Sequence, residues 1–126
     1  MPDIVNTSKA PAKIGPYSHA IRAGNFLFVS GQLPIDPATG NIVGNDIASQ
    51  TCQVLRNIKS IMIAAGMDVG NLIKVSVYLT NIDDLAAMNE VYQTFIKSCF
   101  PARLVVEVSG LIRDALVEIE AVGFKE

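Results

Sequence analysis

Hydrophobic and polar residues alternate along this chain with two different periods, which predicts a mixture of strands and helices. Alternation with period two is typical of strands, because successive side chains of an extended chain point to opposite faces of a sheet. Apolar residues three and four positions apart are typical of helices, because they share one helical face. Residues 72–80 show the first pattern, since Ile73, Val75, Val77 and Leu79 alternate with more polar side chains.

Six segments carry this alternation or a run of strand-forming residues. The predicted strands are Ser18–Ala23, Phe26–Ser30, a short segment around Ile42, Leu72–Thr80, Ala102–Val108 and Leu116–Val122. A tight turn at Gly24 and Asn25 joins the first two strands, and a second turn at Asp36–Gly40 reverses the chain again. Three prolines in the first sixteen residues predict an extended arm before the first strand.

The helical spacing occurs twice. Asp46 is the predicted N-cap of a first helix, whose apolar residues recur at helical spacing until Gly66 ends it. Asp83 is the predicted N-cap of a second helix, and Pro101 prevents that helix from continuing. Each helix has one apolar face, which we expect to pack on a sheet.

The order of these elements favours an α+β fold, with a mixed β-sheet and two helices packed on one of its faces. With 126 residues, the chain has the size of one domain, so we expect residues 1–126 to form a single domain. Half of the residues are hydrophobic and only 17% are charged. A domain this small cannot bury so much apolar surface alone, so we expect self-association with clefts between subunits.

The charge pattern argues against nucleic acid and membranes as partners. The net charge is -2, and Lys and Arg residues are scattered rather than clustered. The N-terminus lacks a signal-peptide pattern, and no apolar run approaches the roughly 20 residues that span a bilayer. We therefore expect a soluble, cytoplasmic protein.

Cys52, Cys99 and the single His19 are a poor set of metal ligands, because their spacing matches no metal motif. We expect no metal site. The two cysteines are interpreted as reduced and inert parts of the packing, and His19 as a structural histidine.

Arg103 is the charged residue that most needs an explanation, because it interrupts the apolar segment PARLVVEV. A guanidinium in such surroundings requires an anion. One interpretation is an internal ion pair with a glutamate of a neighbouring strand, Glu107, Glu118 or Glu120. The other is a ligand carboxylate held by two parallel hydrogen bonds. The sequence leaves both open.

Glu118 and Glu120 lie two residues apart on a predicted strand, so both point to one face. Such a pair can divide into acid and base roles, or can simply neutralise basic neighbours. Tyr17 ends the arm, where its ring can cover a pocket. Ser30 and Gly31 follow a predicted strand, where a glycine lets the backbone approach a ligand closely.

The sequence resembles the YjgF/YER057c/UK114 family nearly from end to end. The segments that carry the resemblance are APAKIGPYSHA, LFVSGQLPIDPATG, AAGM, VSVYLTNIDDLAAMNEVY, FPAR and VEIEAV. The resemblance implies a chorismate-mutase-like subunit, a homotrimer, and three ligand clefts at the subunit interfaces. It also implies hydrolysis of reactive 2-imino acids, such as 2-iminobutanoate and 2-iminopropanoate, to 2-keto acids and ammonia without a cofactor.

The resemblance assigns roles to single residues. It implies that Arg103 holds the substrate carboxylate, that Glu118 activates water and that Tyr17 lines the cleft. Ser30 and Gly31 match a family segment beside the ligand, and an asparagine of the second helix, Asn89, also matches. From the sequence alone, the side chain of Asn89 is expected to be solvated.

One departure from the family pattern falls within this site. Many members read PARSCVEV, whereas Leu104 and Val105 stand here in place of Ser and Cys. The main chain near Val105 can still orient the imine nitrogen. Burial beside Val105 is also expected to raise the pKa of Glu118.

Two other functions remain open at this point. A trimer with an altered cleft can bind small keto or amino acids without converting them. RNA cleavage or inhibition of translation is also ascribed to members of the family, although the chain has no basic face for RNA.

Overall fold

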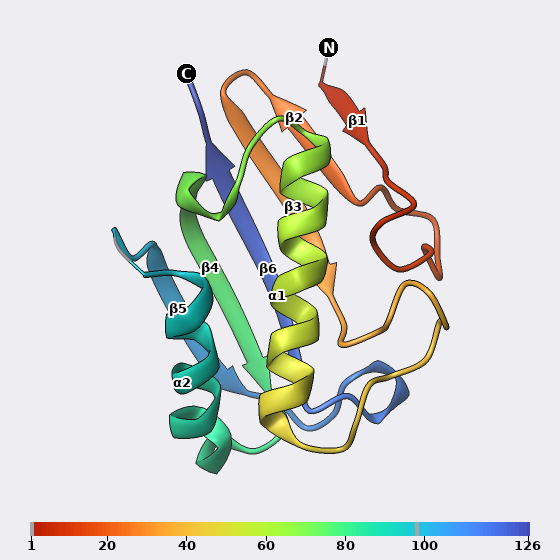
Figure 1. Cartoon of the computed structure of the whole chain (residues 1–126), viewed down its shortest axis with the longest axis vertical. Coiled ribbons are helices and arrows are strands. Elements are labelled where there is room, and N and C mark those ends of the chain that lie inside the picture. Colours follow the sequence, from red (N-terminus) through yellow and green to blue (C-terminus); the bar gives the residue numbers. More distant parts are fainter. Residues whose placement is uncertain (1, 98) are drawn as a thin grey trace.

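The computed structural model describes residues 2–97 and 99–126, which form one six-stranded sheet with two α-helices (Figure 1). The strands in chain order are β1 (Asp3–Val5), β2 (Ala20–Ala23), β3 (Phe26–Gln32), β4 (Leu72–Leu79), β5 (Ala102–Glu107) and β6 (Val117–Phe124). Their order across the sheet is β1-β2-β3-β6-β4-β5. The β4–β5 pair is parallel and all other pairs are antiparallel, which confirms the predicted mixed sheet of an α+β fold.

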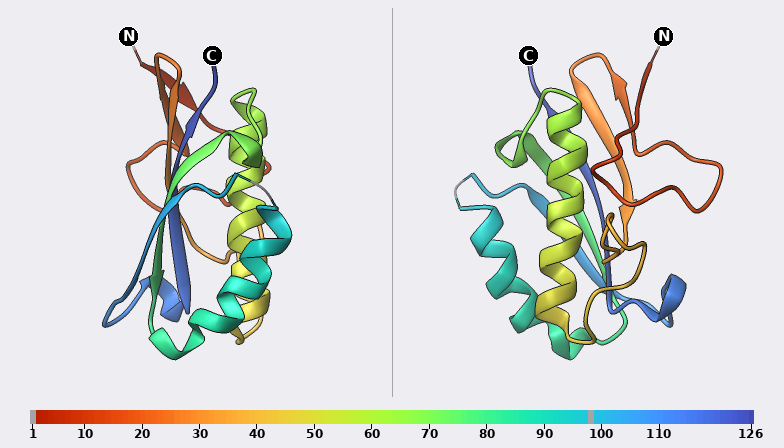
Figure 2. Two further views of the ribbon diagram at one scale, coloured as in Figure 1. Left: turned by 90° about the vertical axis from the view of Figure 1, so that its left-hand side faces the viewer. Right: turned by 45° about the vertical axis from the view of Figure 1, so that its right-hand side comes forward.

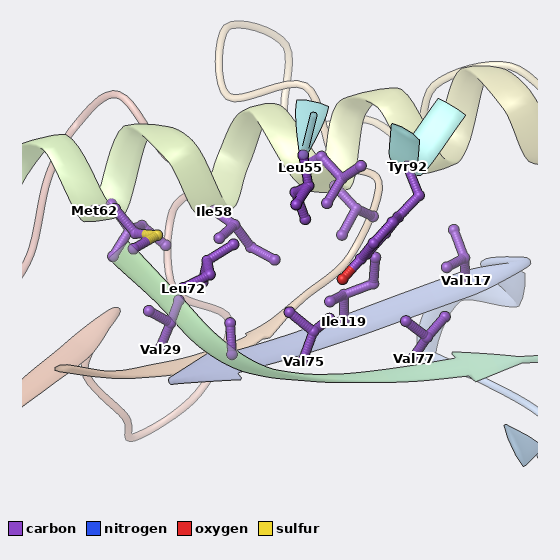
Figure 3. Close-up of a cluster of buried hydrophobic side chains, with 14 of the residues drawn as sticks. Val29, Leu55, Ile58, Met62, Leu72, Val75, Val77, Tyr92, Val117 and Ile119 are labelled. Atoms are coloured by element: carbon purple, nitrogen blue, oxygen red, sulfur yellow. The ribbon is translucent and has the colours of Figure 1, made fainter. Parts of the chain in front are cut away.

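Both helices, α1 (Ile47–Ala64) and α2 (Leu85–Phe95), cover the same face of the sheet, as predicted (Figure 2). Their apolar faces meet the inward side chains of β3, β4 and β6 (Figure 3). Ile58 and Met62 of α1 lie in this core with Val77 of β4 and Ile119 of β6, and all four are fully buried. Burying each such side chain contributes roughly 1.5–3 kcal/mol to folding.

Both ends of α1 have the partners that a helix terminus requires. At the N-terminus, the Asp46 carboxylate accepts a hydrogen bond from the Ser49 backbone N–H at 2.9 Å, which confirms the predicted cap. At the C-terminus, Arg22 donates to the Ala65 carbonyl and Lys125 donates to the Gly66 carbonyl. These two cations also face the negative end of the helix dipole.

The predicted N-cap of α2, Asp83, is one residue too early, because Asp84 is the N-cap of this helix. Asp83 lies within a short 3-10 turn, η2 (Ile82–Asp84), and α2 begins only at Leu85. Asn81 starts this turn by accepting a hydrogen bond from the Asp83 backbone N–H at 2.9 Å. Asp83 and Asp84 are adjacent residues of the same type, so the sequence does not show which of them begins the helix.

The N-terminal segment is not simply an extended arm, because β1 pairs antiparallel with β2 at the edge of the sheet. His19 holds the following residues in place. The Thr7 backbone N–H donates to its Nδ1 at 3.1 Å, so Nε2 carries the proton and donates to the Pro11 carbonyl at 2.7 Å. The structure confirms His19 as a buried structural residue.

Two other strand predictions need correction. Ile42 makes only an isolated bridge with Ile35, because the Asp36–Gly40 turn leaves too few residues for a strand. Ile73 was expected on the inner face but is exposed. A register shift between Leu72 and Lys74 places Leu72 inward instead, which a local bulge can do without breaking the strand.

The face of the sheet without helices carries a set of exposed apolar side chains. Phe26 and Phe28 of β3 are both more than two-fifths exposed, and Leu104 of β5 is half exposed. The rings of Phe26 and Phe124 lie 5.1 Å apart between centroids. In residues 2–97 and 99–126, no helix has the length and apolar character needed to cross a membrane.

Asn57 of α1 should be essential for stability. It is fully buried, and its Nδ2 donates to the Leu33 and Ile35 carbonyls at 3.1 and 2.9 Å. Asn57→Ala leaves both carbonyls unpaired and creates a cavity, so we expect a loss of about 2–4 kcal/mol in the free energy of urea unfolding. The matched variant Asn45→Ala, at an exposed position, should stay within about 0.5 kcal/mol of the parent protein. Equal losses in the two variants would contradict this role.

Candidate active site in two halves

Arg103 lies on the side of the sheet that the helices cover, at its β5 edge. It is paired with Val75 of β4, which points into the core. Its Nη1 donates to Asn89 Oδ1 at 2.7 Å, and its guanidinium lies 4.9 Å from the centre of the Tyr92 ring. A hollow of about 390 Å³ opens beside it, lined by Asn89, Tyr92, Gln93, Phe100, Pro101 and Arg103. We call this the arginine half-site.

The contacts of Arg103 argue against one of the two interpretations of its charge, the ion pair with a glutamate of the same chain. Both are with uncharged groups, and the side chain is exposed. Glu118 and Glu120 point to the opposite face of the sheet, and Glu107 accepts a hydrogen bond from the Ile82 backbone N–H at 2.9 Å. An ion pair within the strand does not form, so most of the five N–H donors of the guanidinium remain available for a ligand carboxylate.

The aromatic ring of Tyr92 lies against the guanidinium of Arg103. Its ring is buried, and its hydroxyl points into the core toward the strands (Figure 3). Burial raises the pKa of Tyr92, an effect that the nearby Arg103 charge partly opposes. The neutral ring therefore offers its face to the cation, which is a favourable arrangement.

Glu118 lies on the uncovered face of the sheet, opposite Tyr78 of β4. A hollow of about 370 Å³ beside it is lined by Ile14, Tyr17, Ser30, Gly31, Leu33, Ile112, Glu118 and Glu120. We call this the glutamate half-site. The structure thus brings together four of the predicted site residues, and it confirms that Glu118 and Glu120 share one face.

A bulge in β3 makes room for Glu118. The pairing of β3 with β6 shifts register between Val29 and Gln32, so Ser30 and Gly31 leave the regular ladder. A Cβ atom on Gly31 would overlap Glu118 Oε2. Ser30 Oγ donates to the Ser18 carbonyl at 2.6 Å and ties the bulge to the segment that carries Tyr17. Gly31 is therefore needed for space next to the carboxylate.

The pKa of Glu118 is raised above its ordinary value. The main cause is burial, and repulsion from the Glu120 carboxylate adds to it. The direction and the main cause, burial, agree with the sequence prediction, but the predicted neighbour, Val105, does not lie beside Glu118 within one chain. Val105 pairs with Val77 and packs against the core, one strand away from β6 and on the other face of the sheet. The side chain of Val105 therefore does not bury Glu118 within one chain.

The two half-sites lie on opposite faces of the sheet. Arg103 and Asn89 belong to the face covered by the helices, whereas Tyr17, Ser30 and Glu118 belong to the uncovered face. A sheet separates them, so one copy of the chain cannot bring the guanidinium and the Glu118 carboxylate to the same small ligand.

Comparison with known proteins places the chain in a family. A family model described as Endoribonuclease L-PSP matches residues 7–124. The chain belongs to this family. The match confirms the resemblance noted in the sequence, because the same family is called YjgF, RutC or RidA. A RutC family protein of Pyrococcus horikoshii is 56% identical over the full length of both chains.

Two further members of the L-PSP family bear on the chemistry. A Bos taurus protein named 2-iminobutanoate/2-iminopropanoate deaminase is 44% identical over 95% of this chain and 88% of its own length. The crystal structure of Escherichia coli TdcF with bound serine superimposes with a TM-score of 0.95 at 39% identity, covering 98% of this chain and 99% of that one.

The structure also shows what the sequence interpretation of this L-PSP family chain missed. Tyr92 was assigned only to the core, although its ring also supports Arg103. The residue pattern alone predicted a solvated side chain for Asn89, whereas the family resemblance placed Asn89 at the site, where its Oδ1 accepts a hydrogen bond from Arg103. Ile14 and Ile112 were not singled out, because an isolated isoleucine in a loop carries no pattern. Cys99 is exposed rather than packed inside. Among the residues described, no three His, Cys, Asp or Glu side chains cluster as a metal site requires.

Replacing Glu120 by Gln should lower the pKa of Glu118. The substitution removes the neighbouring negative charge and keeps the size of the side chain, so the Glu118 carboxylate becomes easier to ionise. The measurement is a titration of the glutamate side-chain carboxyl carbons by NMR. Glu90→Gln is the control, because Glu90 lies exposed on α2 and should leave the Glu118 titration unchanged. An unshifted Glu118 titration in Glu120→Gln would contradict the electrostatic coupling.

Proposed function

We propose that this chain is an imine deaminase, which hydrolyses reactive 2-imino acids to 2-keto acids and ammonia. The observation that carries the proposal is the pair of half-sites. One offers a guanidinium suited to a carboxylate, and the other offers a carboxylate with a raised pKa next to a hollow. These are the groups that hydrolysis of a 2-imino acid needs. The bovine relative named as such a deaminase supports the assignment.

The separation of the half-sites predicts how copies of the chain assemble. A site that needs both halves must form where the arginine half-site of one copy meets the glutamate half-site of the next. Two different surfaces then meet, so the contact is heterologous and the assembly closes as a ring. We propose a ring of three, a homotrimer of chorismate-mutase-like subunits with one cleft at each interface. The exposed Phe26, Phe28 and Leu104 support burial of the uncovered face in such an assembly.

In the proposed reaction, each cleft uses residues from two copies of the chain. Arg103 of one copy binds the substrate carboxylate, and this holds the imine carbon C2 near Glu118 of the next. Glu118 takes a proton from water as the water oxygen bonds to C2, and the electron pair of the protonated C=N bond moves to nitrogen. A raised pKa suits Glu118 to this role as a general base near neutral pH.

The tetrahedral intermediate then collapses. Glu118 returns the proton to the nitrogen, the C–N bond breaks, and ammonia leaves with that electron pair. The hydroxyl oxygen forms the C=O bond of the 2-keto acid, and its proton passes to the departing ammonia. The substrate and water therefore become a 2-keto acid and an ammonium ion, with no electron gained or lost.

A second candidate function is binding without conversion. TdcF, with serine bound, indicates that a protein of this fold can hold a small amino acid. The two candidates predict different rates of 2-iminobutanoate hydrolysis. In the assay, the imine is generated in solution from an amino acid, and the imine that is not hydrolysed is trapped with semicarbazide. A wild-type protein that binds 2-ketobutanoate but leaves the trapping rate unchanged would favour the binding protein.

Mixing two inactive variants should restore activity if each cleft combines two copies. Arg103→Ala and Glu118→Gln should each lower kcat/KM for 2-iminobutanoate by about 100-fold or more. After the two are unfolded and refolded together, every trimer that contains both variants has one cleft with both native residues. Random mixing predicts recovery of about a quarter of the wild-type rate.

In the control experiment, one of the two single variants is refolded together with the double variant Arg103→Ala, Glu118→Gln instead of with the other single variant. No cleft can then combine both native residues, so the activity should stay at the level of the single variants. Recovery with the control, or none with the two single variants despite correct assembly, would contradict a shared cleft.

Gly31→Ala should impair catalysis more than folding. The new methyl group overlaps Glu118 Oε2, and the flexible end of that side chain can move away at little cost to stability. The displaced carboxylate no longer aims the water, so we expect kcat to fall by roughly 10- to 100-fold. Thermal unfolding should show a nearly unchanged Tm. Gly70→Ala is the matched control, since a methyl group there meets no neighbouring atom and should leave kcat unchanged.

A further inference from the structure

The glutamate half-site is lined in part by large aliphatic side chains, which imine hydrolysis itself does not require. Leu33 forms the buried part of this lining, whereas Ile14 and Ile112 are 54% and 56% exposed in the subunit. The three side chains come from the N-terminal segment, the end of β3 and the segment before β6, so separate parts of the chain supply them. Large aliphatic groups kept at the edge of a polar hollow offer a surface for the apolar part of a ligand.

Ile112 is held in position by a backbone segment under strain. It begins a 3-10 turn, η3 (Ile112–Asp114), in which Arg113 and Asp114 both have left-handed φ angles, of 58° and 57°. Such angles are uncommon for residues other than glycine and cost free energy. Arg113 Nη1 donates to the Gly40 carbonyl at 2.9 Å and fastens the turn to the rest of the molecule. Strain that is kept by outside contacts is typical of functional segments.

The charges that line the glutamate half-site restrict the charge that a substrate side chain can carry. Glu118 and Glu120 are the two ionisable carboxylates of the lining, and no Lys or Arg belongs to it. A substrate with a second carboxylate in its side chain would meet repulsion from both glutamates. An uncharged aliphatic side chain avoids this repulsion and gains contact with the isoleucines.

We propose that Ile112, together with Ile14, binds the aliphatic side chain of the substrate and makes the chain selective for larger 2-imino acids. The inference rests on the proposed function for its reaction, and names the substrate class of the same site. With the carboxylate on Arg103 and C2 beside Glu118, the remaining carbon atoms of the substrate extend along Ile112. Substrates with three or four side-chain carbons are then preferred to 2-iminopropanoate, and acidic ones are rejected.

Binding of 2-keto acids tests this selectivity without requiring catalysis. The wild-type protein is titrated by calorimetry with 2-ketopropanoate, 2-ketobutanoate, 2-ketopentanoate and 2-oxoglutarate. We expect affinity to rise roughly fourfold for each added methylene group. Binding of 2-oxoglutarate should be weaker than that of 2-ketopentanoate. The same series of imines is then compared by kcat/KM.

Ile112→Ala should remove most of the chain-length preference, so that the ratio of affinities for 2-ketopentanoate and 2-ketopropanoate falls by roughly tenfold. Ile63→Ala is the matched control, because Ile63 is 54% exposed on α1 and lies outside both half-sites. Phe100→Ala tests the other apolar wall, since Phe100 lines the arginine half-site.

The outcomes separate the inference from the proposed function. A preference for long chains that Ile112→Ala abolishes supports the inference even if no imine is hydrolysed, in which case only the proposed reaction fails. A flat response of wild-type affinity to chain length would overturn the inference. So would a preference that Phe100→Ala abolishes and Ile112→Ala leaves intact, because the side chain would then lie in the other half-site.

Discussion

The packing of both helices on one face of the sheet is the constraint on which the rest of the structure depends. In β6, Val117, Ile119 and Ala121 point toward the helices and are buried. Because side chains alternate along a strand, Glu118 and Glu120 must then point to the uncovered face. The position of the candidate base is therefore a consequence of how the core packs, and a shift of β6 by one residue would bury both carboxylates.

The same constraint places Arg103 on the other face. It lies at the β5 edge, where Asn89 and Tyr92 of α2 hold it and where a ligand can reach it. In the proposed trimer, assembly completes the site and buries the apolar side chains of the uncovered face. Hydrophobic burial would then stabilise the arrangement that the chemistry requires, so that oligomerisation and catalysis depend on one contact.

The glutamate half-site departs from what stability alone would favour. Burial and a like charge make the ionised form of Glu118 less favourable, as its raised pKa shows. Arg113 and Asp114 adopt left-handed angles without being glycine. Sites that bind and react commonly retain such local costs, and the packed core of α1, β4 and β6 compensates for them.

The sequence by itself determined the elements and much of their arrangement. The periods of apolar residues located both helices and five of the six strands, since burial of one face leaves a pattern in the residues themselves. It also placed Glu118 and Glu120 on one face, because strand geometry requires this. It missed β1, whose three residues are too few to show a period and which forms through pairing with β2.

Only the tertiary structure decided which candidate residues meet. The sequence left the partner of Arg103 open, and it placed Val105 beside Glu118, although within one chain β4 lies between their strands. Strand order depends on contacts between distant segments, and a local pattern does not record them. The strand order separates Arg103 from Glu118. The place of Ile112 beside the Glu118 carboxylate follows from a strained turn, which no residue type in the sequence indicates.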